Sequence, residues 1–408
     1  MAACAETPAT VLVSKPRPNY ADASIAIAAG LAITLTLTFL IVMPLVRSMA
    51  GEHDFVVYWA TGQQLVHQAD PYDPMAMAKI EHAAGLPIHG SFYMRNPPWG
   101  LSLALPLGHF SARAAAVPWS LLMLGVMLVS LHILWQVIGR PRNPLPLLGY
   151  AFPPALFCVM MGQTSLFLLL GLVLFLRFHR TRPLVAGAAL WLCSLKPHLF
   201  LPFATALLLW IVFTRAWRIL LGFVPVMAAS CVVTQCVDPA AWSQYLHWAG
   251  NSGISHEPIP CLSVVFRTFI NPDATWLVSI PSVIACVWAV IYFWQRRHVW
   301  DWVEHGNLLM LVSLVVAPYC WVHDQVLALP ALLWAAWRTQ SRPLLAMLAL
   351  AYIALEVQSL NPAGLVSWSY LWPAPLWLLW YLIARSSAPS LECFPAPASA
   401  ESESFATL

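Results

Sequence analysis

Long apolar stretches without charged side chains recur along the chain, and they limit what it can fold into. The stretch from Ser24 to Val46 carries no charge and meets the requirement of about 20 apolar residues to cross a hydrocarbon core about 30 Å thick. Hydrophobic residues make up 60% of the 408 positions and charged residues only 9%, whereas soluble domains carry about 25% charged residues. The sequence therefore predicts a polytopic membrane protein and excludes a soluble globular domain.

The spacing of further apolar stretches predicts an all-α bundle of about 12 transmembrane helices. Some stretches are short, and the one from Gln163 to Leu176 would cover only about 21 Å as a helix. Short helices beside long ones predict an internal hollow. We expect the membrane body over residues 24–385, between a cytoplasmic segment 1–23 and a cytoplasmic tail 386–408 that its composition predicts to be disordered.

Positive charges near helix ends indicate the orientation, because Lys and Arg beside transmembrane helices prefer the cytoplasm. Lys15 and Arg17 precede the first helix, so the N-terminus is expected inside. Arg113 and Arg140 cannot both lie inside if one span separates them. Either the segment from Pro97 to Phe110 enters and returns without crossing, or the charge rule fails at this point.

Two segments expected on the outer side, 47–96 and 238–274, are too long to be simple turns. The first carries apolar and aromatic residues at helical spacing, which predicts an amphipathic helix lying at the membrane interface. These residues are Phe55, Tyr58, Trp59, Gly62, Leu65 and Val66. The sequence also leaves open a disulfide between Cys236 and Cys261 on this side.

Polar side chains cluster at the expected outer ends of the helices, where ionisable groups are costly and therefore mark candidates for function. Asp54 follows the first helix, and it is either a cap for a helix that begins at Phe55 or a catalytic carboxylate. Gln163 supplies a neutral hydrogen-bonding group near another boundary.

Lys196, followed by His198, lies between two short apolar stretches. It is either a lysine that reaches to the interface or a cation that faces an anionic ligand. His323 and Asp324 interrupt an otherwise apolar tract. They either share a hydrogen bond that joins two helices or belong to a site.

A carboxylate, cations and imidazoles on one side of a membrane suit glycosyl transfer from a lipid-linked phosphate. An inverting enzyme needs a carboxylate to accept the proton of the acceptor hydroxyl, opposite the leaving group of an oxocarbenium-like transition state. It also needs cations or hydrogen-bond donors to stabilise the charge that develops on the phosphate.

Several motifs, in their order along the chain, resemble glycosyltransferase family 87. They are Asp54-x3-Tyr58, Asp70-Pro71-Tyr72-Asp73-Pro74, Tyr93-Met94-Arg95-Asn96-Pro97-Pro98, Met161-Gly162-Gln163, Lys196-Pro197-His198 and Pro318-Tyr319-x3-His323-Asp324. The resemblance covers roughly residues 50 to 340 and implies a C-type membrane glycosyltransferase fold with a large first outer loop. It also implies a multi-pass protein of the bacterial inner membrane with its active site on the periplasmic or extracellular side.

The resemblance further implies a polyprenyl-phosphate-sugar donor and a glycan or glycolipid acceptor, with mannose as the expected sugar because the family includes bacterial α-mannosyltransferases. It makes Asp54 the general base and implies phosphate contacts by Arg95, Lys196 and His198, with His323 lining the pocket. Tyr58, Gln163 and Asp324 complete the set of expected substrate-binding residues.

Two other functions compete with a transferase. A transporter or flippase of lipid-linked sugars would place its site near the bilayer midplane between matching halves, and the halves of this chain do not match. A catalytically silent protein that only binds the lipid carrier is the third hypothesis, and Asp54 argues against it.

Cofactors and nucleic acids are not expected. The sequence leaves a divalent metal open without indicating one, because Asp54 with His53 provides too few ligands to specify a site. The chain has no glycine-rich phosphate loop. A formal net charge of only +3, without a dense cluster of Lys and Arg, argues against a nucleic-acid partner.

Overall fold

The computed structural model describes residues 54–85, 94–139, 148–251, 259–339, 341–359 and 368–387. These residues form helices and no strand, which confirms the prediction of an all-α fold. The expected first helix over Ser24–Val46 lies outside the described residues, as do the segment 1–23 and the tail beyond residue 387.

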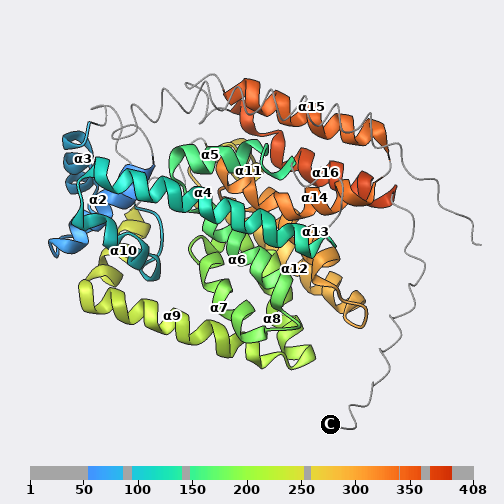
Figure 1. Ribbon diagram of the computed structural model, residues 1–408, viewed down its shortest axis with the longest axis horizontal. Helices are drawn as coiled ribbons and strands as arrows, with labels where there is room; N and C mark the ends of the chain where they lie inside the picture. Colours follow the sequence, from blue (N-terminus) through green and yellow to red (C-terminus); the bar gives the residue numbers. More distant parts are fainter. Residues whose placement is uncertain are drawn as a thin grey trace, which may run out of the picture.

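The helices are shown in their order along the chain in Figure 1. In the first half they are α2 (Phe55–Val66), α3 (Pro74–Ala83), η1 (Pro98–Leu103), η2 (Leu105–His109), α4 (Ala112–Val137), α5 (Pro153–Met161), α6 (Ser165–Phe178), α7 (Pro183–Cys193), η4 (Pro197–Phe200) and α8 (Leu201–Thr214). In the second half they are α9 (Trp217–Val237), α10 (Ala241–Asn251), α11 (Leu262–Ile270), η6 (Thr275–Ser279), α12 (Ile280–Arg296), η7 (Trp302–Gly306), α13 (Asn307–Val316), η8 (Val322–Ala328), α14 (Leu329–Arg338), α15 (Arg342–Ser359), η10 (Trp368–Tyr370) and α16 (Pro373–Ser386).

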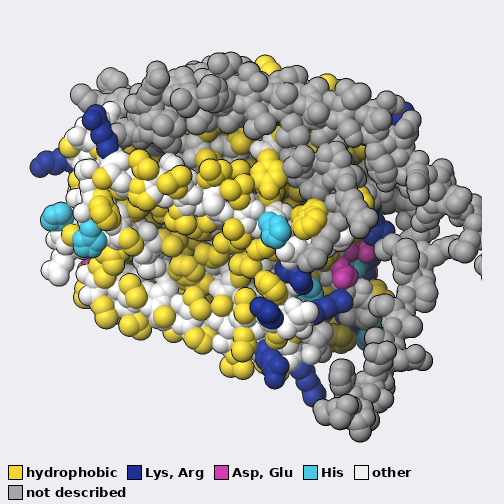
Figure 2. Space-filling model, viewed as in Figure 1, with side chains coloured by type: hydrophobic (Ala, Val, Ile, Leu, Met, Phe, Trp, Pro, Cys, Tyr) yellow, Lys and Arg dark blue, Asp and Glu magenta, His cyan; other side chains and the backbone are white. Residues whose placement is uncertain are grey.

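Five helical segments of the described chain are long and apolar enough to cross a membrane, as expected for a membrane protein. They are Ala112–Val137, Pro197–Thr214, Trp217–Val237, Thr275–Arg296 and Arg342–Ser359. The prediction of about 12 crossings is not confirmed by these lengths. Helix α6 has 14 residues and so extends about 21 Å, which confirms the short helix predicted there. Figure 2 shows hydrophobic side chains spread over the middle of one face, with Lys and Arg gathered toward its ends.

Helices α6, α7 and α9 pack in succession, and glycines allow α7 and α9 to approach closely. A Cβ on Gly187 of α7 would collide with the carbonyl oxygen of Ile219, and one on Gly222 of α9 would collide with that of Leu184. Small residues at such contacts are typical of helix pairs in membranes, where van der Waals packing drives association.

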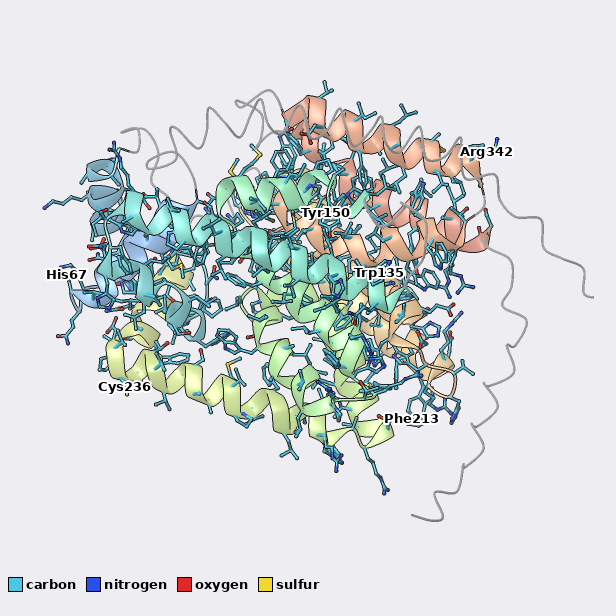
Figure 3. The ribbon with its side chains drawn as sticks, in the orientation of Figure 1. His67, Trp135, Tyr150, Phe213, Cys236 and Arg342 are labelled. Atoms are coloured by element: carbon cyan, nitrogen blue, oxygen red, sulfur yellow. The ribbon has the colours of Figure 1, made fainter. Side chains whose placement is uncertain are left out.

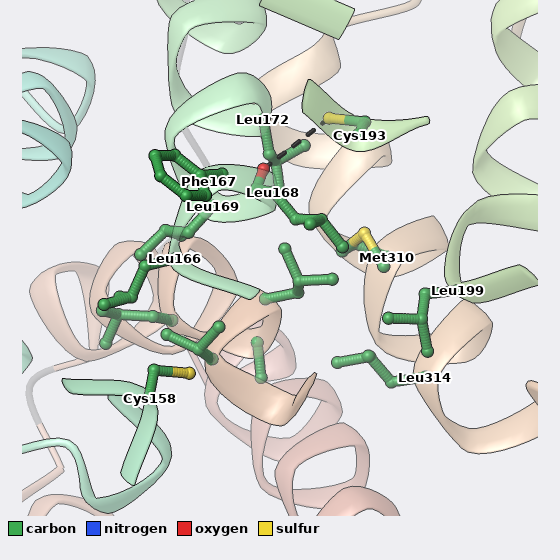
Figure 4. Packing of buried hydrophobic residues seen from close by; sticks show 14 of the residues in the cluster. Cys158, Leu166, Phe167, Leu168, Leu169, Leu172, Cys193, Leu199, Met310 and Leu314 are labelled. Carbon is green, nitrogen blue, oxygen red and sulfur yellow. Dashed lines mark hydrogen bonds between the residues drawn. The ribbon is translucent and has the colours of Figure 1, made fainter. Parts of the chain in front are cut away.

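Helix α6 also forms the centre of the buried core (Figure 4). Its residues Leu166, Leu168 and Leu169 are fully buried, and the thiol of Cys193 on α7 donates to the Leu168 carbonyl at 3.6 Å. This packing holds the N-terminal end of α6, beginning at Ser165, in a fixed position.

The segment from Pro97 to Phe110 consists of the two 3₁₀ helices η1 and η2. At about 2.0 Å per residue, neither is long enough to cross a bilayer. The hypothesis that this segment does not cross is therefore favoured over a failure of the charge rule.

Helix α2 begins at Phe55, as predicted, but it is not an amphipathic helix at the interface. It is buried on nearly all sides and contacts η2 and α3. Gly62 lies against Gly108, where an added Cβ would be 2.6 Å from the Gly108 nitrogen. The expectation was wrong because η2 packs against α2 at Gly62 and Gln63, so the helix is enclosed by protein instead of lying at a surface.

Cys236 and Cys261 do not form the disulfide that the sequence left open. Both thiols are free, and Cys236 is exposed at the end of α9 (Figure 3) whereas Cys261 is buried. The Cys261 thiol instead donates to the carbonyl of Pro318 at 3.7 Å.

Candidate active site

Asp54 and Gln163 meet where α2 begins and α5 ends. Asp54 precedes α2 but makes no side-chain capping bond, so the hypothesis of a helix cap is wrong. Its Oδ2 instead accepts a hydrogen bond from Nε2 of Gln163. Gly162 ends α5 with φ +70°, and an added Cβ there would be 2.8 Å from the Cβ of Phe55. A glycine in the left-handed conformation thus brings Gln163 to the start of α2.

The hydrogen bonds around Gln163 fix the orientation of its amide. Its Oε1 accepts from the hydroxyl of Tyr58 at 3.2 Å and from Nζ of Lys196 at 3.3 Å. Because the oxygen faces two donors, the NH₂ group must be the end that faces Asp54. This contact suits an ionised carboxylate, which accepts hydrogen bonds and donates none.

The second oxygen of Asp54, Oδ1, forms no hydrogen bond with another described residue, and the side chain is only partly buried. One lone-pair-bearing oxygen of an oriented carboxylate is therefore open to a ligand. This is the arrangement that a general base needs.

Lys196 forms a buried ion pair with Asp324. Its Nζ lies 2.7 Å from Oδ1 of Asp324, whose side chain is 0% exposed, against 11% for Lys196. Nζ also donates to Oγ of Ser165 at 3.0 Å, and Ser165 Oγ donates to the same Asp324 oxygen at 2.6 Å. The other oxygen, Oδ2, accepts from the backbone N–H of Trp321 at 3.1 Å. Lys196 therefore does not reach to the interface, and its charge is compensated inside the protein.

These ionisable groups lie on segments that connect the candidate spans, and their environment shifts their pKa values. Burial alone would raise the pKa of Asp324, but the ammonium of Lys196 and two hydrogen bonds hold it well below the usual range. Burial alone would lower the pKa of Lys196, but Asp324 raises it. Burial lowers the pKa of His323 to about 4, so this imidazole is neutral at pH 7.

His323 lies at the edge of the network. Its Nε2 is 3.5 Å from Nζ of Lys196 and 3.5 Å from Oδ1 of Asp324, so the bond between His323 and Asp324 is not the main contact of that carboxylate. The imidazole is nearly parallel to the ring of Trp321, at 10° and a centroid separation of 6.4 Å. The guanidinium of Arg95 lies 5.8 Å from the centroid of the same ring.

His198 lies beside the network rather than in it. Its ring stacks on Tyr319 with the centroids 3.7 Å apart, and its buried Nε2 has no hydrogen-bond partner within the described segments. The structure thus brings Asp54, Gln163 and Lys196 into one network with Tyr58, Asp324 and His323, with Arg95 and His198 at its border.

Sequence reasoning missed three contributors to this network. Ser165 bonds both members of the ion pair, Thr164 shares a hydrogen bond of 3.0 Å with the Tyr58 hydroxyl, and Trp321 donates its backbone N–H. Ser165 and Thr164 could have been found from their position beside Gln163 at the start of an apolar stretch, where a hydroxyl can form hydrogen bonds without adding a charge. No side-chain pattern reveals the backbone donor.

In the described part of the chain, no group of three or more His, Cys, Asp and Glu side chains could hold a metal ion. His53, considered with Asp54 as a ligand pair, falls outside that part.

Comparisons with known proteins give one match. The model of glycosyltransferase family 87 matches residues 93–318, which is more than half of the 408 residues. This range includes Gln163, Lys196 and His198, while Asp54 and Asp324 lie beyond its ends. No curated protein and no solved structure matches the chain. The chain therefore belongs to glycosyltransferase family 87 and is a membrane glycosyltransferase.

Proposed function

We propose that this enzyme transfers a hexose from a polyprenyl-phosphate donor to a glycan or glycolipid acceptor, with inversion and with Asp54 as the general base. The observation that carries the proposal is the oriented carboxylate of Asp54, which Gln163 holds through Nε2 while Lys196 and Tyr58 fix the other end of the amide. A mannose donor and a C-type fold are expected from the family resemblance.

The proposed reaction is a single displacement at the anomeric carbon. The acceptor hydroxyl oxygen forms a bond to this carbon, and its proton passes to Oδ1 of Asp54. The bond between the anomeric carbon and the phosphate oxygen breaks, and its electron pair leaves with the polyprenyl phosphate. Because the transition state is oxocarbenium-like, a carboxylate on the acceptor side assists attack and a hydrogen-bonded phosphate on the other side assists departure.

Within this proposal, Lys196 acts mainly as a positioning residue. An ammonium group has three N–H bonds, and Gln163, Ser165 and Asp324 accept from Lys196 at 3.3, 3.0 and 2.7 Å. The donors are thus already engaged by the protein. Arg95 and His198 remain the proposed phosphate contacts among the residues that the family resemblance suggests.

The location proposed for this chemistry is the outer face of a bacterial inner membrane, as the positive charges near the helix ends favour. A lipid-linked donor is present in the bilayer itself, which agrees with a site built from segments between apolar helices. Membership of a glycosyltransferase family favours an enzyme over the alternative of a transporter or flippase.

Purified full-length protein in detergent tests the proposal, because a transporter has no second compartment there. We expect the protein to transfer mannose from a short-chain polyprenyl-phosphate mannose to lipid acceptors in an extract. Mass spectrometry detects the product. Asp54→Asn should reduce product formation by about 100-fold or more without changing the unfolding temperature. Asp273→Asn, at an exposed aspartate, is the matched control. Near-normal product from Asp54→Asn would refute the assignment of the base.

A further inference from the structure

Arg267 on α11 is a buried cation that pairs with no carboxylate in the described part of the chain. It is 4% exposed, and its Nε and Nη1 have no hydrogen-bond partner among the residues that the structure describes. No carboxylate of the described residues forms an ion pair with it. A buried charge of this kind costs several kcal/mol unless it is paired, and ionisable groups inside membrane proteins are functional candidates for that reason.

The helix itself gives Arg267 only weak compensation. Arg267 lies in the last turn of α11, where the helix dipole favours a positive charge by about 0.3 to 1 kcal/mol at exposed sites. A dipole leaves the N–H bonds of the guanidinium unsatisfied. The unsatisfied N–H groups of Arg267 can therefore donate to the oxygen atoms of a bound anion.

The surroundings of α11 indicate where such an anion would come from. Phe269 is 85% exposed and Trp276 of the adjoining η6 is 65% exposed, and α11 packs against η6. Tryptophan is enriched at the membrane interface, at the depth of the lipid head groups, and Trp276 lies at the start of the candidate span Thr275–Arg296. Arg267 is thus on the buried side of a short helix whose other side presents apolar residues to that depth.

The same helix is joined to the candidate active site. Long side chains of a helix lean toward its N-terminus. Arg267 therefore leans toward the N-terminal end of α11, which follows Cys261. The Cys261 thiol donates to Pro318 at 3.7 Å. Pro318 is followed by Tyr319, which stacks on His198 with its centroid 3.7 Å away. Five residues beyond Tyr319, Asp324 pairs with Lys196.

We propose that Arg267 binds the phosphate group of an isoprenoid lipid, the carrier released by or delivered to the candidate active site. The guanidinium donates its Nε and Nη1 hydrogens to phosphate oxygens, in the forked geometry that arginine offers and lysine does not. The proposal rests on the proposed function for the identity of the lipid. Arg267 also supplies the uncompensated positive charge that Lys196 cannot supply.

Equilibrium binding to the purified full-length protein in detergent tests this assignment. The probes are a short-chain prenyl phosphate, the corresponding prenol and inorganic phosphate. Arg267→Gln should weaken prenyl phosphate binding at least tenfold, as the loss of charged hydrogen bonds requires, and leave prenol binding unchanged. Arg267→Lys should give an intermediate loss. Arg218→Gln, at an exposed arginine of α9, should bind as the unaltered protein does.

A second measurement separates a binding role from a structural one. Removal of an uncompensated buried charge should leave the unfolding temperature of the ligand-free protein unchanged or higher, as is common for residues kept for function. Prenyl phosphate should then raise the unfolding temperature of the unaltered protein and not that of Arg267→Gln. A structural arginine would give the opposite result for the ligand-free protein.

Several outcomes would overturn the proposal. Unchanged affinity of Arg267→Gln for prenyl phosphate would do so, and if that variant fails to fold, unchanged affinity of Arg267→Lys would do so. Equal affinity for inorganic phosphate and prenyl phosphate would assign the site to a free anion instead.

The variant Asp54→Asn separates this proposal from the proposed function, and it should still bind prenyl phosphate. If Asp54→Asn also transfers sugar normally, the proposed base fails while the Arg267 site stands.

Discussion

Loss of the Asp324 carboxylate should destabilise the protein far more than an average substitution. Asp324→Asn keeps the shape of the side chain but leaves the Lys196 ammonium without a counter-charge at a position that is 11% exposed. Breaking a buried ion pair by removing one partner typically costs about 3 to 5 kcal/mol, because the remaining charge stays desolvated. Activity should fall as well, because Lys196 helps to orient Gln163.

The matched comparison is the ion pair between Arg385 and Glu304. Its atoms are 2.6 Å apart, but the side chains are 26% and 37% exposed. This pair is only half-buried, and fully exposed pairs contribute about 0 to 1 kcal/mol, so Glu304→Gln should be milder than Asp324→Asn. The two variants differ in burial and also in the hydrogen bonds that are lost, because Asp324 accepts from Ser165 and Trp321 as well.

The assay is thermal unfolding in detergent, followed by the fluorescence of the 21 tryptophans, together with sugar transfer. The double variant Lys196→Met with Asp324→Leu should recover most of the lost stability, since apolar pairs of similar volume often replace buried ion pairs without cost. It should not recover transfer. If Asp324→Asn unfolds at the temperature of the unaltered protein, the ion pair contributes little and this account of the site is wrong.

The pH dependence of stability provides an independent check on the pair. The pKa of Asp324 is lowered in the folded protein, so its stabilising contribution is present above the unfolded value of about 3.9 and is lost as pH falls through the folded value. The pKa of Lys196 is raised, so that contribution is lost only as pH rises through its folded value. The stability difference between the unaltered protein and Asp324→Asn should therefore be largest near pH 5 and shrink as pH rises, because burial without Asp324 lowers the pKa of Lys196 in the variant and lets it lose its charge.

Two further predictions concern the orientation of the base and the packing of α2. Gln163→Met should lower kcat/KM by roughly 10- to 150-fold, the equivalent of one charged hydrogen bond of about 1.5 to 3 kcal/mol, and should add little to the defect of Asp54→Asn because the two residues act together. A similar kcat/KM for Gln163→Met and the unaltered enzyme would contradict this role. Gly62→Ala should destabilise the protein by about 1 to 3 kcal/mol, because the added Cβ would be 2.6 Å from the backbone nitrogen of Gly108. Thermal unfolding checks this against Gly125→Ala, where nothing lies within 4 Å and stability should be kept.

The sequence was sufficient to identify the class of the protein and several members of the site. Each of these inferences depended on a local property, such as an uncharged stretch of about 20 residues or a polar residue placed where the membrane makes it costly. Asp54, Gln163 and Lys196 were named for that reason, and the structure brings them together.

The burial of α2 could not be predicted in this way. The residues from Phe55 to Val66 show helical spacing, but the spacing does not reveal that η2 returns to cover the helix at Gly62. The structure of the segment from Pro97 to Phe110 could not be predicted either. Its apolar composition allows a transmembrane span, but it forms two short 3₁₀ helices.

The sequence by itself determined that this chain is an α-helical membrane protein. It also identified the polar residues whose place among apolar helices is energetically costly and which are therefore candidates for function. Only the tertiary structure decided how their charges are balanced. Lys196 finds Asp324, 128 positions further along the chain, whereas Arg267 finds no carboxylate among the described residues. The physical reason is that hydropathy is a property of each segment, while the compensation of a buried charge depends on which segments meet in space.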